Sequence, residues 1–158
     1  MKVVFLDIDG VLNSWKYDQE RTSLQDNIDE TRLPLLKEIV DMTQAKIVLT
    51  SSWRKHWDPK GVLTDEIGKC LELTFNKYHI SLFDKTIEID GFNRAEEIRS
   101  WLKKWQVEEF VILDDIAFGW ADLSNHLVKT NYRIGRGLND KHVSLAISIL
   151  NGERNVQE

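Results

Sequence analysis

Cysteine is nearly absent from the sequence, and long apolar runs are absent altogether. The single cysteine, Cys70, excludes an intramolecular disulfide and a cysteine-rich metal site. No apolar run approaches the roughly 20 residues that a membrane-spanning helix needs. Met1–Leu6 leads directly into Asp7, without the long apolar region of a signal peptide. We therefore expect a cytoplasmic protein.

An excess of positive charge is also missing. The net charge of -5 argues against indiscriminate wrapping of nucleic acid, although it does not exclude a local basic patch. The hydrophobic fraction of 42% and the charged fraction of 30% are typical of a globular domain. A chain of 158 residues can bury roughly 70% of its unfolded surface in one core. We predict a single domain over residues 1–150 and a polar tail over residues 151–158.

Short, wholly apolar runs alternate with amphipathic stretches, which is typical of a parallel sheet covered by helices on both faces. The runs are rich in β-branched residues and too short for buried helices. They predict three central strands, at Val3–Leu6, Ile47–Leu49 and Phe110–Leu113. A weaker fourth candidate is Leu127–Thr130. The pattern predicts an α/β fold.

Apolar residues at helical spacing predict three helices, at Leu33–Val40, Ala95–Trp105 and Val143–Leu150. Pro34 marks the start of the first helix, and Asn93 is the expected N-cap of the second. The pattern is weakest between residues 54 and 92. There we predict a helix over Thr64–Phe75 and a short strand over Ile87–Ile89.

Polar side chains follow each of the three central strands, at the sheet edge where parallel α/β folds bind ligands. They are Asp7, Asp9, Thr50, Ser51, Asp114 and Asp115. Four carboxylates at one edge raise one another's pKa unless a cation neutralises them. The pattern therefore implies a divalent metal, and oxygen-only ligands suit Mg²⁺.

Each of these elements also has a purely structural interpretation. Asp7–Gly10 could form a turn, Thr50–Ser51 is more often a helix cap than a phosphate ligand, and Asp114–Asp115 could be a cap. An EF-hand loop is excluded, because Val11 and Asp18 stand where that motif needs an oxygen ligand and a glutamate. Three such elements at three strand ends are much harder to obtain from capping alone.

A carboxylate at a strand end can attack phosphorus and form an aspartyl phosphate, which makes Asp7 the natural nucleophile. Asp9 can protonate the leaving oxygen and then activate water. Asp7, Asp114 and Asp115 are the expected side-chain ligands of the metal. Thr50 can donate a hydrogen bond to the transferring phosphoryl group.

Three segments of the chain, FLDIDGVL at Phe5–Leu12, KIVLTS at Lys46–Ser51 and VILDD at Val111–Asp115, match motifs of a known superfamily. On these motifs the sequence resembles the haloacid dehalogenase-like (HAD) phosphohydrolases. Arg94 holds the place of the remaining motif, a Lys or Arg that opens the helix before the last strand, and Lys85 is the alternative. Through Ile47–Arg54 and the run from Arg94 to Asp115, the sequence is similar to the small HAD domains of Swiss-army-knife RNA repair proteins.

The resemblance implies a Rossmann-like three-layer sandwich and a Mg²⁺-dependent phosphatase. It implies that the backbone carbonyl of Asp9 is a further metal ligand. It gives Arg94 the role of stabilising charge in the transition state. Substrate contacts are expected from Gly10, Ser51 and Arg54.

HAD enzymes that act on small metabolites usually carry a cap domain. Neither Asn13–Arg32 nor Arg54–Asn93 is long enough for a large cap, so we expect an open site that admits a phosphate on a nucleic-acid end or a protein. The run Trp53–Trp57 interleaves aromatic and basic residues, as single-strand binders do. Alternatively, its tryptophans are packing residues and its cations, with Lys60, form a solvated face.

Two other functions remain open at this point. A phosphotransferase would use the same aspartyl intermediate, and it would pass the phosphoryl group to an alcohol. A non-catalytic receiver domain also places acidic residues at strand ends. Receivers carry the acceptor aspartate after a middle strand, however, where this chain has Thr50.

Overall fold

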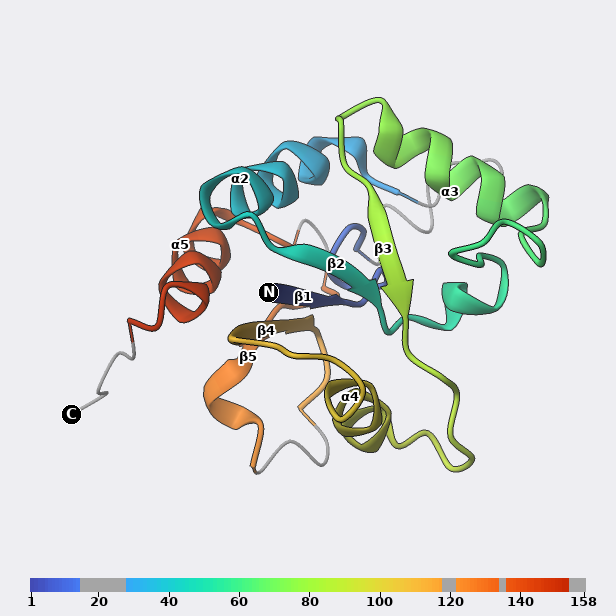
Figure 1. The fold of residues 1–158 in the computed structure, drawn as a ribbon. Helices are drawn as coiled ribbons and strands as arrows, with labels where there is room; N and C mark the ends of the chain where they lie inside the picture. The colour runs from blue at the N-terminus through green and yellow to red at the C-terminus, as the bar shows by residue number, and fades with distance from the viewer. Residues whose placement is uncertain (15–27, 118–121, 134–135, 154–158) are drawn as a thin grey trace.

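A single five-stranded parallel sheet forms the centre of the fold, with the strand order β3-β2-β1-β4-β5. The computed structural model describes residues 1–14, 28–117, 122–133 and 136–153 (Figure 1). The strands are β1 (Lys2–Leu6), β2 (Lys46–Leu49), β3 (Leu82–Lys85), β4 (Glu109–Asp114) and β5 (Leu127–Lys129). Within these residues the α-helices are α2 (Leu33–Thr43), α3 (Glu66–Asn76), α4 (Arg94–Leu102) and α5 (Asp140–Leu150). The described 3-10 turns are η2 (Glu30–Arg32), η3 (Ser52–Lys55) and η4 (Ser124–His126).

Alternate side chains of the central strands enter two different cores, because successive residues of a strand face opposite sides of the sheet. Val4 and Leu6 of β1 belong to the core that α2, α3 and α5 cover. Val3 and Phe5 belong to the core beneath α4. Figure 1 shows α2 and α5 on one side of the sheet and α4 on the other. The predicted α/β three-layer sandwich with a central parallel sheet is confirmed.

Local signals account for most of the helix boundaries. Asn93 caps α4 as predicted, since its side chain accepts a hydrogen bond from the amide of Glu96. Pro34 lies in the first turn of α2, where its missing N–H costs nothing. The helix predicted over Thr64–Phe75 is α3, which begins two residues later than predicted because Asp65 is its N-cap.

Two predictions near the sheet edge are wrong. The strand predicted at Ile87–Ile89 lies instead at Leu82–Lys85. It is an edge strand that contains the charged residues Asp84 and Lys85, so its sequence does not form an apolar run. Trp105 lies beyond the end of α4, where it stacks on Trp101 with ring centroids 5.3 Å apart.

The Arg54–Asn93 segment contributes to the main layers of the fold. Leu71 and Phe75 of α3 are buried in the core, and β3 extends the sheet. Within the continuously described residues 28–117, no part forms a separate cap domain. Residues 15–27, in the other candidate cap segment, and residues 154–158 of the predicted tail lie outside the described residues.

None of the described helices is long and apolar enough to cross a membrane.

Candidate active site

The register of the sheet brings three predicted site residues to one level. Leu6 of β1 pairs with Leu49 of β2 and with Leu113 of β4, so the next residues along are Thr50, Asp7 and Asp114. Backbone hydrogen bonds continue the sheet there, from the amide of Asp7 to the carbonyl of Leu113 and from the amide of Thr50 to that of Leu6 (both 3.0 Å). The side chains therefore start from a rigid edge.

An acidic triad consisting of Asp7, Asp114 and Asp115 lies at this edge. Each residue offers a carboxylate oxygen, and these oxygens all lie within 4.8 Å of one another. The Oδ1 atoms of Asp7 and Asp114 accept the amides of Ile8 and Ile116, each at 2.9 Å. These amide bonds orient two of the three carboxylates.

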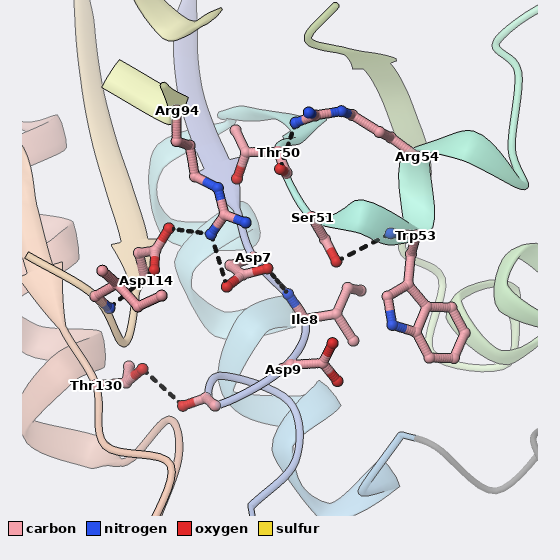
Figure 2. Close-up of polar contacts among 12 residues, drawn as sticks. Asp7, Ile8, Asp9, Thr50, Ser51, Trp53, Arg54, Arg94, Asp114 and Thr130 are labelled. Carbon is pink, nitrogen blue, oxygen red and sulfur yellow. Dashed lines mark hydrogen bonds and ion pairs between the residues drawn. The ribbon is translucent and has the colours of Figure 1, made fainter. Parts of the chain in front are cut away.

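Arg94 contacts two members of the acidic triad. Its Nη1 donates to Oδ2 of Asp7 at 2.9 Å and to Oδ2 of Asp114 at 2.6 Å (Figure 2). Since α4 begins at Arg94, the helix start directs this side chain over the end of β1. Nε and Nη2 have no hydrogen-bond partner in the described part of the chain, so they are available to an incoming anion.

Lys85, the alternative for the third motif, is engaged elsewhere. Its Nζ donates to the backbone carbonyls of Arg54 and Trp57, at 2.8 and 2.6 Å. Of the two candidates, Arg94 thus contacts the carboxylates, whereas Lys85 binds backbone carbonyls in the segment after β2.

Burial raises the pKa of carboxylates in the acidic triad. Desolvation raises the pKa of Asp7 to about 7, although the Arg94 guanidinium acts to lower it. Burial and the charge of Asp114 also raise the pKa of Asp115. Burial acts to lower the pKa of Arg94, but the charges of Asp7 and Asp114 outweigh it and raise this pKa. One guanidinium is therefore not enough to offset three carboxylates.

The acidic triad fits a divalent cation. Three negative charges oppose one positive charge at this edge, and all of the donors are hard carboxylate oxygens. An ionised carboxylate has more lone pairs than the amide and guanidinium bonds use here. The donor set matches the preference of Mg²⁺ for oxygen ligands.

Gly10 permits the close approach of Asp115. Its φ of +85° lies in the region that favours glycine, and a Cβ there would lie 2.5 Å from Cγ of Asp115. The Gly10 amide donates to Oδ1 of Asn13 at 2.8 Å, and its carbonyl accepts from Oγ1 of Thr130 at 2.7 Å. Because both backbone groups are used internally, the residue serves the turn. The predicted substrate contact remains a prediction.

Asp9 lies next to the acidic triad, and its side chain is not one of the three carboxylates. Its Oδ1 accepts a hydrogen bond from Nδ2 of Asn13 at 2.8 Å. In Figure 2 its carboxylate points away from Asp114. Asn13 thus holds both Asp9 and Gly10 at the turn after β1. The predicted role of Asp9 in proton transfer remains a prediction.

Thr50 and Ser51 differ in their surroundings although both are fully buried. The Thr50 hydroxyl has no hydrogen-bond partner in the described part of the chain. A buried hydroxyl without a partner is costly, and a ligand oxygen would relieve it. The Ser51 hydroxyl instead accepts the amide of Trp53 at 3.2 Å as the cap of η3. The helix-cap alternative therefore describes Ser51, and Thr50 remains a candidate phosphate ligand.

Arg54 forms a buried ion pair with Glu97 of α4. Nη1 and Nη2 contact the two carboxylate oxygens at 2.8 and 3.0 Å. Nη1 also donates to the Thr50 carbonyl at 2.6 Å and to Thr86 Oγ1 at 3.2 Å. The pair thus ties the end of β2 to the helix that Arg94 opens.

This pair changes the interpretation of the run Trp53–Trp57. Arg54 is only 9% exposed and Trp57 only 3%, so neither can serve as a surface for a single strand. Lys55 and Lys60 are exposed. Glu97 occupies both terminal nitrogens of Arg54, and the buried Nε has no partner within the described residues. The burial of Arg54 argues against a contact with nucleic-acid phosphates, and its predicted substrate contact remains a prediction.

We expect Glu97→Ala to lower the free energy of unfolding by about 3–5 kcal/mol, because it leaves the Arg54 charge buried without its partner. Chemical denaturation measures this loss. Glu96→Ala is the matched control, since Glu96 is the half-exposed partner of Arg99 on the same helix. The free energy of unfolding of Glu96→Ala should change little. Equal losses in the two variants would contradict a special role for the buried pair.

Sequence reasoning missed Glu97, Asn13 and Thr130, which support the site without touching the triad. Glu97 carried a signal, since it lies four residues before Trp101 and hence on the same, buried helix face. A charged residue on a buried face needs a buried partner. No comparable signal singled out Thr130, whose role depends on the proximity of β5 to the Gly10 turn.

Comparison with known proteins gives one family and no individual relative. The family model of the HAD domain in Swiss Army Knife RNA repair proteins matches residues 3–143. No curated protein and no solved structure matches the chain. The matched residues include the acidic triad, Thr50 and Arg94. The chain therefore belongs to the family of HAD domains found in Swiss Army Knife RNA repair proteins.

Proposed function

We propose that the chain hydrolyses phosphomonoesters with Mg²⁺ through an aspartyl phosphate on Asp7. Membership in the HAD family supports a phosphohydrolase type of activity. The observation that carries the finer proposal is Arg94 Nη1, which bridges Asp7 and Asp114 within the acidic triad. This arrangement puts a nucleophilic carboxylate, a metal-type donor set and a positive charge at one sheet edge.

In the first step an Asp7 carboxylate oxygen attacks the phosphorus atom. The bond between phosphorus and the ester oxygen breaks, and Asp9 donates a proton to the departing oxygen. The products are an alcohol and an acyl phosphate on Asp7. The buried position of Asp7 supports this role, because a poorly hydrated carboxylate needs little desolvation before it attacks.

In the second step water attacks the phosphorus atom of the acyl phosphate. Asp9, now ionised, takes a proton from this water, and the phosphorus–Asp7 bond breaks. Inorganic phosphate leaves, and both carboxyl groups return to their starting forms. Asn13 supports both steps by holding Asp9 through the 2.8 Å hydrogen bond.

Three groups can stabilise negative charge on the phosphoryl oxygens. The Thr50 hydroxyl is buried and has a hydrogen bond to give. Nε and Nη2 of Arg94 can donate while Nη1 keeps its two carboxylates. A Mg²⁺ ion held by Asp7, Asp114, Asp115 and the Asp9 carbonyl would act as a Lewis acid on a phosphoryl oxygen.

A terminal phosphate of a nucleic acid is the substrate class that the family description favours, since the related domains occur in RNA repair proteins. The described residues form no large cap that would enclose a small metabolite. A phosphoprotein is the alternative macromolecular substrate.

We expect the purified protein to release phosphate from nitrophenyl phosphate with Mg²⁺ and to lose this activity with a chelator. Because the ion binds the acidic triad only in the folded state, Mg²⁺ at 100 times Kd should add about 2.7 kcal/mol to stability and raise Tm. Asp115→Asn should weaken both effects. The ligand assignment is wrong if Mg²⁺ changes neither activity nor Tm. If an added alcohol receives the phosphoryl group in preference to water, the protein is a phosphotransferase.

A further inference from the structure

A cavity of about 870 Å³ opens beside the acidic triad. Asp115 and Thr130 line it on the side of the site. Its other walls include Lys129 at the end of β5 and Arg133 and Arg136 from the segment that leads to α5. The volume is within the range of pockets that bind small ligands.

The charge of this cavity is opposite to that of the chain. The protein has a net charge of -5, yet three cations line the cavity against the single carboxylate of Asp115. Lys129, Arg133 and Arg136 are exposed, and none of them forms an ion pair within the described residues. Unpaired cations that converge on one cavity favour an anionic ligand.

Hydrogen bonds join the backbone near these cations to the turn after β1. Thr130 donates to the Gly10 carbonyl at 2.7 Å, which joins β5 to the turn after β1. The Arg136 amide donates to the Arg133 carbonyl at 2.9 Å. Two residues beyond Arg136, the amide of Leu138 donates to the Val11 carbonyl at 2.8 Å. The backbone that carries the cations is thus anchored to the same turn as the catalytic residues.

We propose that this cavity binds a second phosphate group of the substrate, with Lys129, Arg133 and Arg136 as its ligands. Arginine forks bind phosphate oxygens in pairs, and lysine adds a point charge. The inference rests on the proposed function, because Asp115 joins the cavity to the phosphoryl-transfer site. These three residues are specificity determinants that select substrates with two phosphates.

The second phosphate has two sources with the same chemistry. It is either the phosphodiester next to a terminal phosphate of an oligonucleotide, or the other phosphate of a free nucleoside bisphosphate. We therefore compare four substrates: nitrophenyl phosphate, a mononucleotide, the corresponding nucleoside 3',5'-bisphosphate, and a short oligonucleotide with a terminal phosphate.

The test variant is Arg133→Gln with Arg136→Gln. Its charge-matched control is Lys103→Gln with Lys104→Gln, two exposed cations that follow α4 at its end remote from Arg94. We expect the wild type to have a higher kcat/KM for the bisphosphate or the oligonucleotide than for the mononucleotide. This preference should fall at least about tenfold in the test variant, mainly through KM, and not in the control.

The source follows from which substrate shows the preference. A preference for the oligonucleotide alone supports a phosphodiester, and an equal preference for the bisphosphate supports a free metabolite. Equal turnover of one-phosphate and two-phosphate substrates would overturn the inference, as would a preference that the test variant retains. Faster turnover of a phosphopeptide, with no effect of the test variant, would also overturn it.

A binding measurement separates the failure of this inference from the failure of the proposed function. The terminally phosphorylated oligonucleotide is titrated into wild type and test variant at several salt concentrations. Loss of the contact to this one additional phosphate should make the slope of log K against log salt shallower by about 0.7. An unchanged slope overturns the cavity assignment even if the protein hydrolyses nitrophenyl phosphate. A shallower slope without any hydrolysis leaves the anion site in place and overturns the phosphatase.

Discussion

Asp7→Asn should lower phosphatase activity by at least about 10⁴-fold, because an amide does not attack phosphorus to form an acyl phosphate. The substitution is nearly isosteric. The remaining carbonyl oxygen can still accept the amide of Ile8, so the turn after β1 should persist. Loss of a buried charge from the triad should leave Tm equal to or above that of the wild type. Steady-state kinetics and thermal melting measure the two effects.

Asp58→Asn is a suitable control for this substitution, since Asp58 follows η3 in the sequence and is not part of the acidic triad. Its activity should remain that of the wild type. Substantial phosphatase activity in a folded Asp7→Asn protein would remove the aspartyl-phosphate mechanism. Asp7 would then be a metal ligand only, and water would have to attack the substrate directly.

Arg94→Ala should lower kcat/KM by about 10²- to 10³-fold, the effect of removing a donor that stabilises transition-state charge. It also removes the nearest positive charge from Asp7 and Asp114, whose oxygens lie 2.9 and 2.6 Å from Nη1. The pKa of Asp7, already raised by burial to about 7, should therefore rise further. At limiting Mg²⁺ the pH-activity profile should shift to higher pH, since Asp7 must be ionised both to bind the ion and to attack phosphorus.

A lysine at position 94 separates the effect of charge from that of hydrogen-bond geometry, and a second variant serves as its control. Both of its carboxylate contacts come from one nitrogen, so Arg94→Lys should recover part of the activity and of the pH profile. Arg99→Ala is the control on the same helix, because Arg99 pairs with Asp122 and Glu96 outside the site. A loss in Arg99→Ala as large as in Arg94→Ala would mean that α4 has been disturbed generally.

The parts of the fold that sequence predicts well depend on apolar periodicity. β1, β2 and β4 are buried on both faces, so their runs of β-branched residues identify them. The edge strand β3 is only partly buried and contains Asp84 and Lys85, so it has no apolar run that would identify it. Its position becomes evident only through its pairing with β2.

The predictable parts of the site are those that follow the strands directly. A parallel sheet in register necessarily brings the residues after β1, β2 and β4 together, so Asp7, Thr50 and Asp114 could be grouped from sequence. Arg94 was identified through the family resemblance, with Lys85 as the alternative, and α4 indeed begins at Arg94 at the same edge.

Contacts that depend on long-range packing could not be predicted. Arg54 and Glu97 are separated by 43 positions, and only the packing of α4 against the end of β2 brings them together. The cavity cations lie at the end of β5 and in the segment after it, and the weak apolar run of β5 does not indicate a site there. The basic run after β2 suggested Arg54 as a phosphate contact, whereas Arg54 is paired with Glu97 and the cations that line a cavity are Lys129, Arg133 and Arg136.

A covalent phosphate on Asp7 is the central claim, and an Asp9→Asn protein tests it most directly. Nitrophenolate leaves without a proton, so this variant should still form the acyl phosphate but should lack the base for its hydrolysis. Nitrophenyl phosphate should give a burst of one nitrophenolate per protein. Acid quenching and peptide mass spectrometry should then find one phosphate on Asp7, and none in a variant that also carries Asp7→Asn. Continued turnover without a burst, with no phosphorylated peptide at any time, would contradict the account.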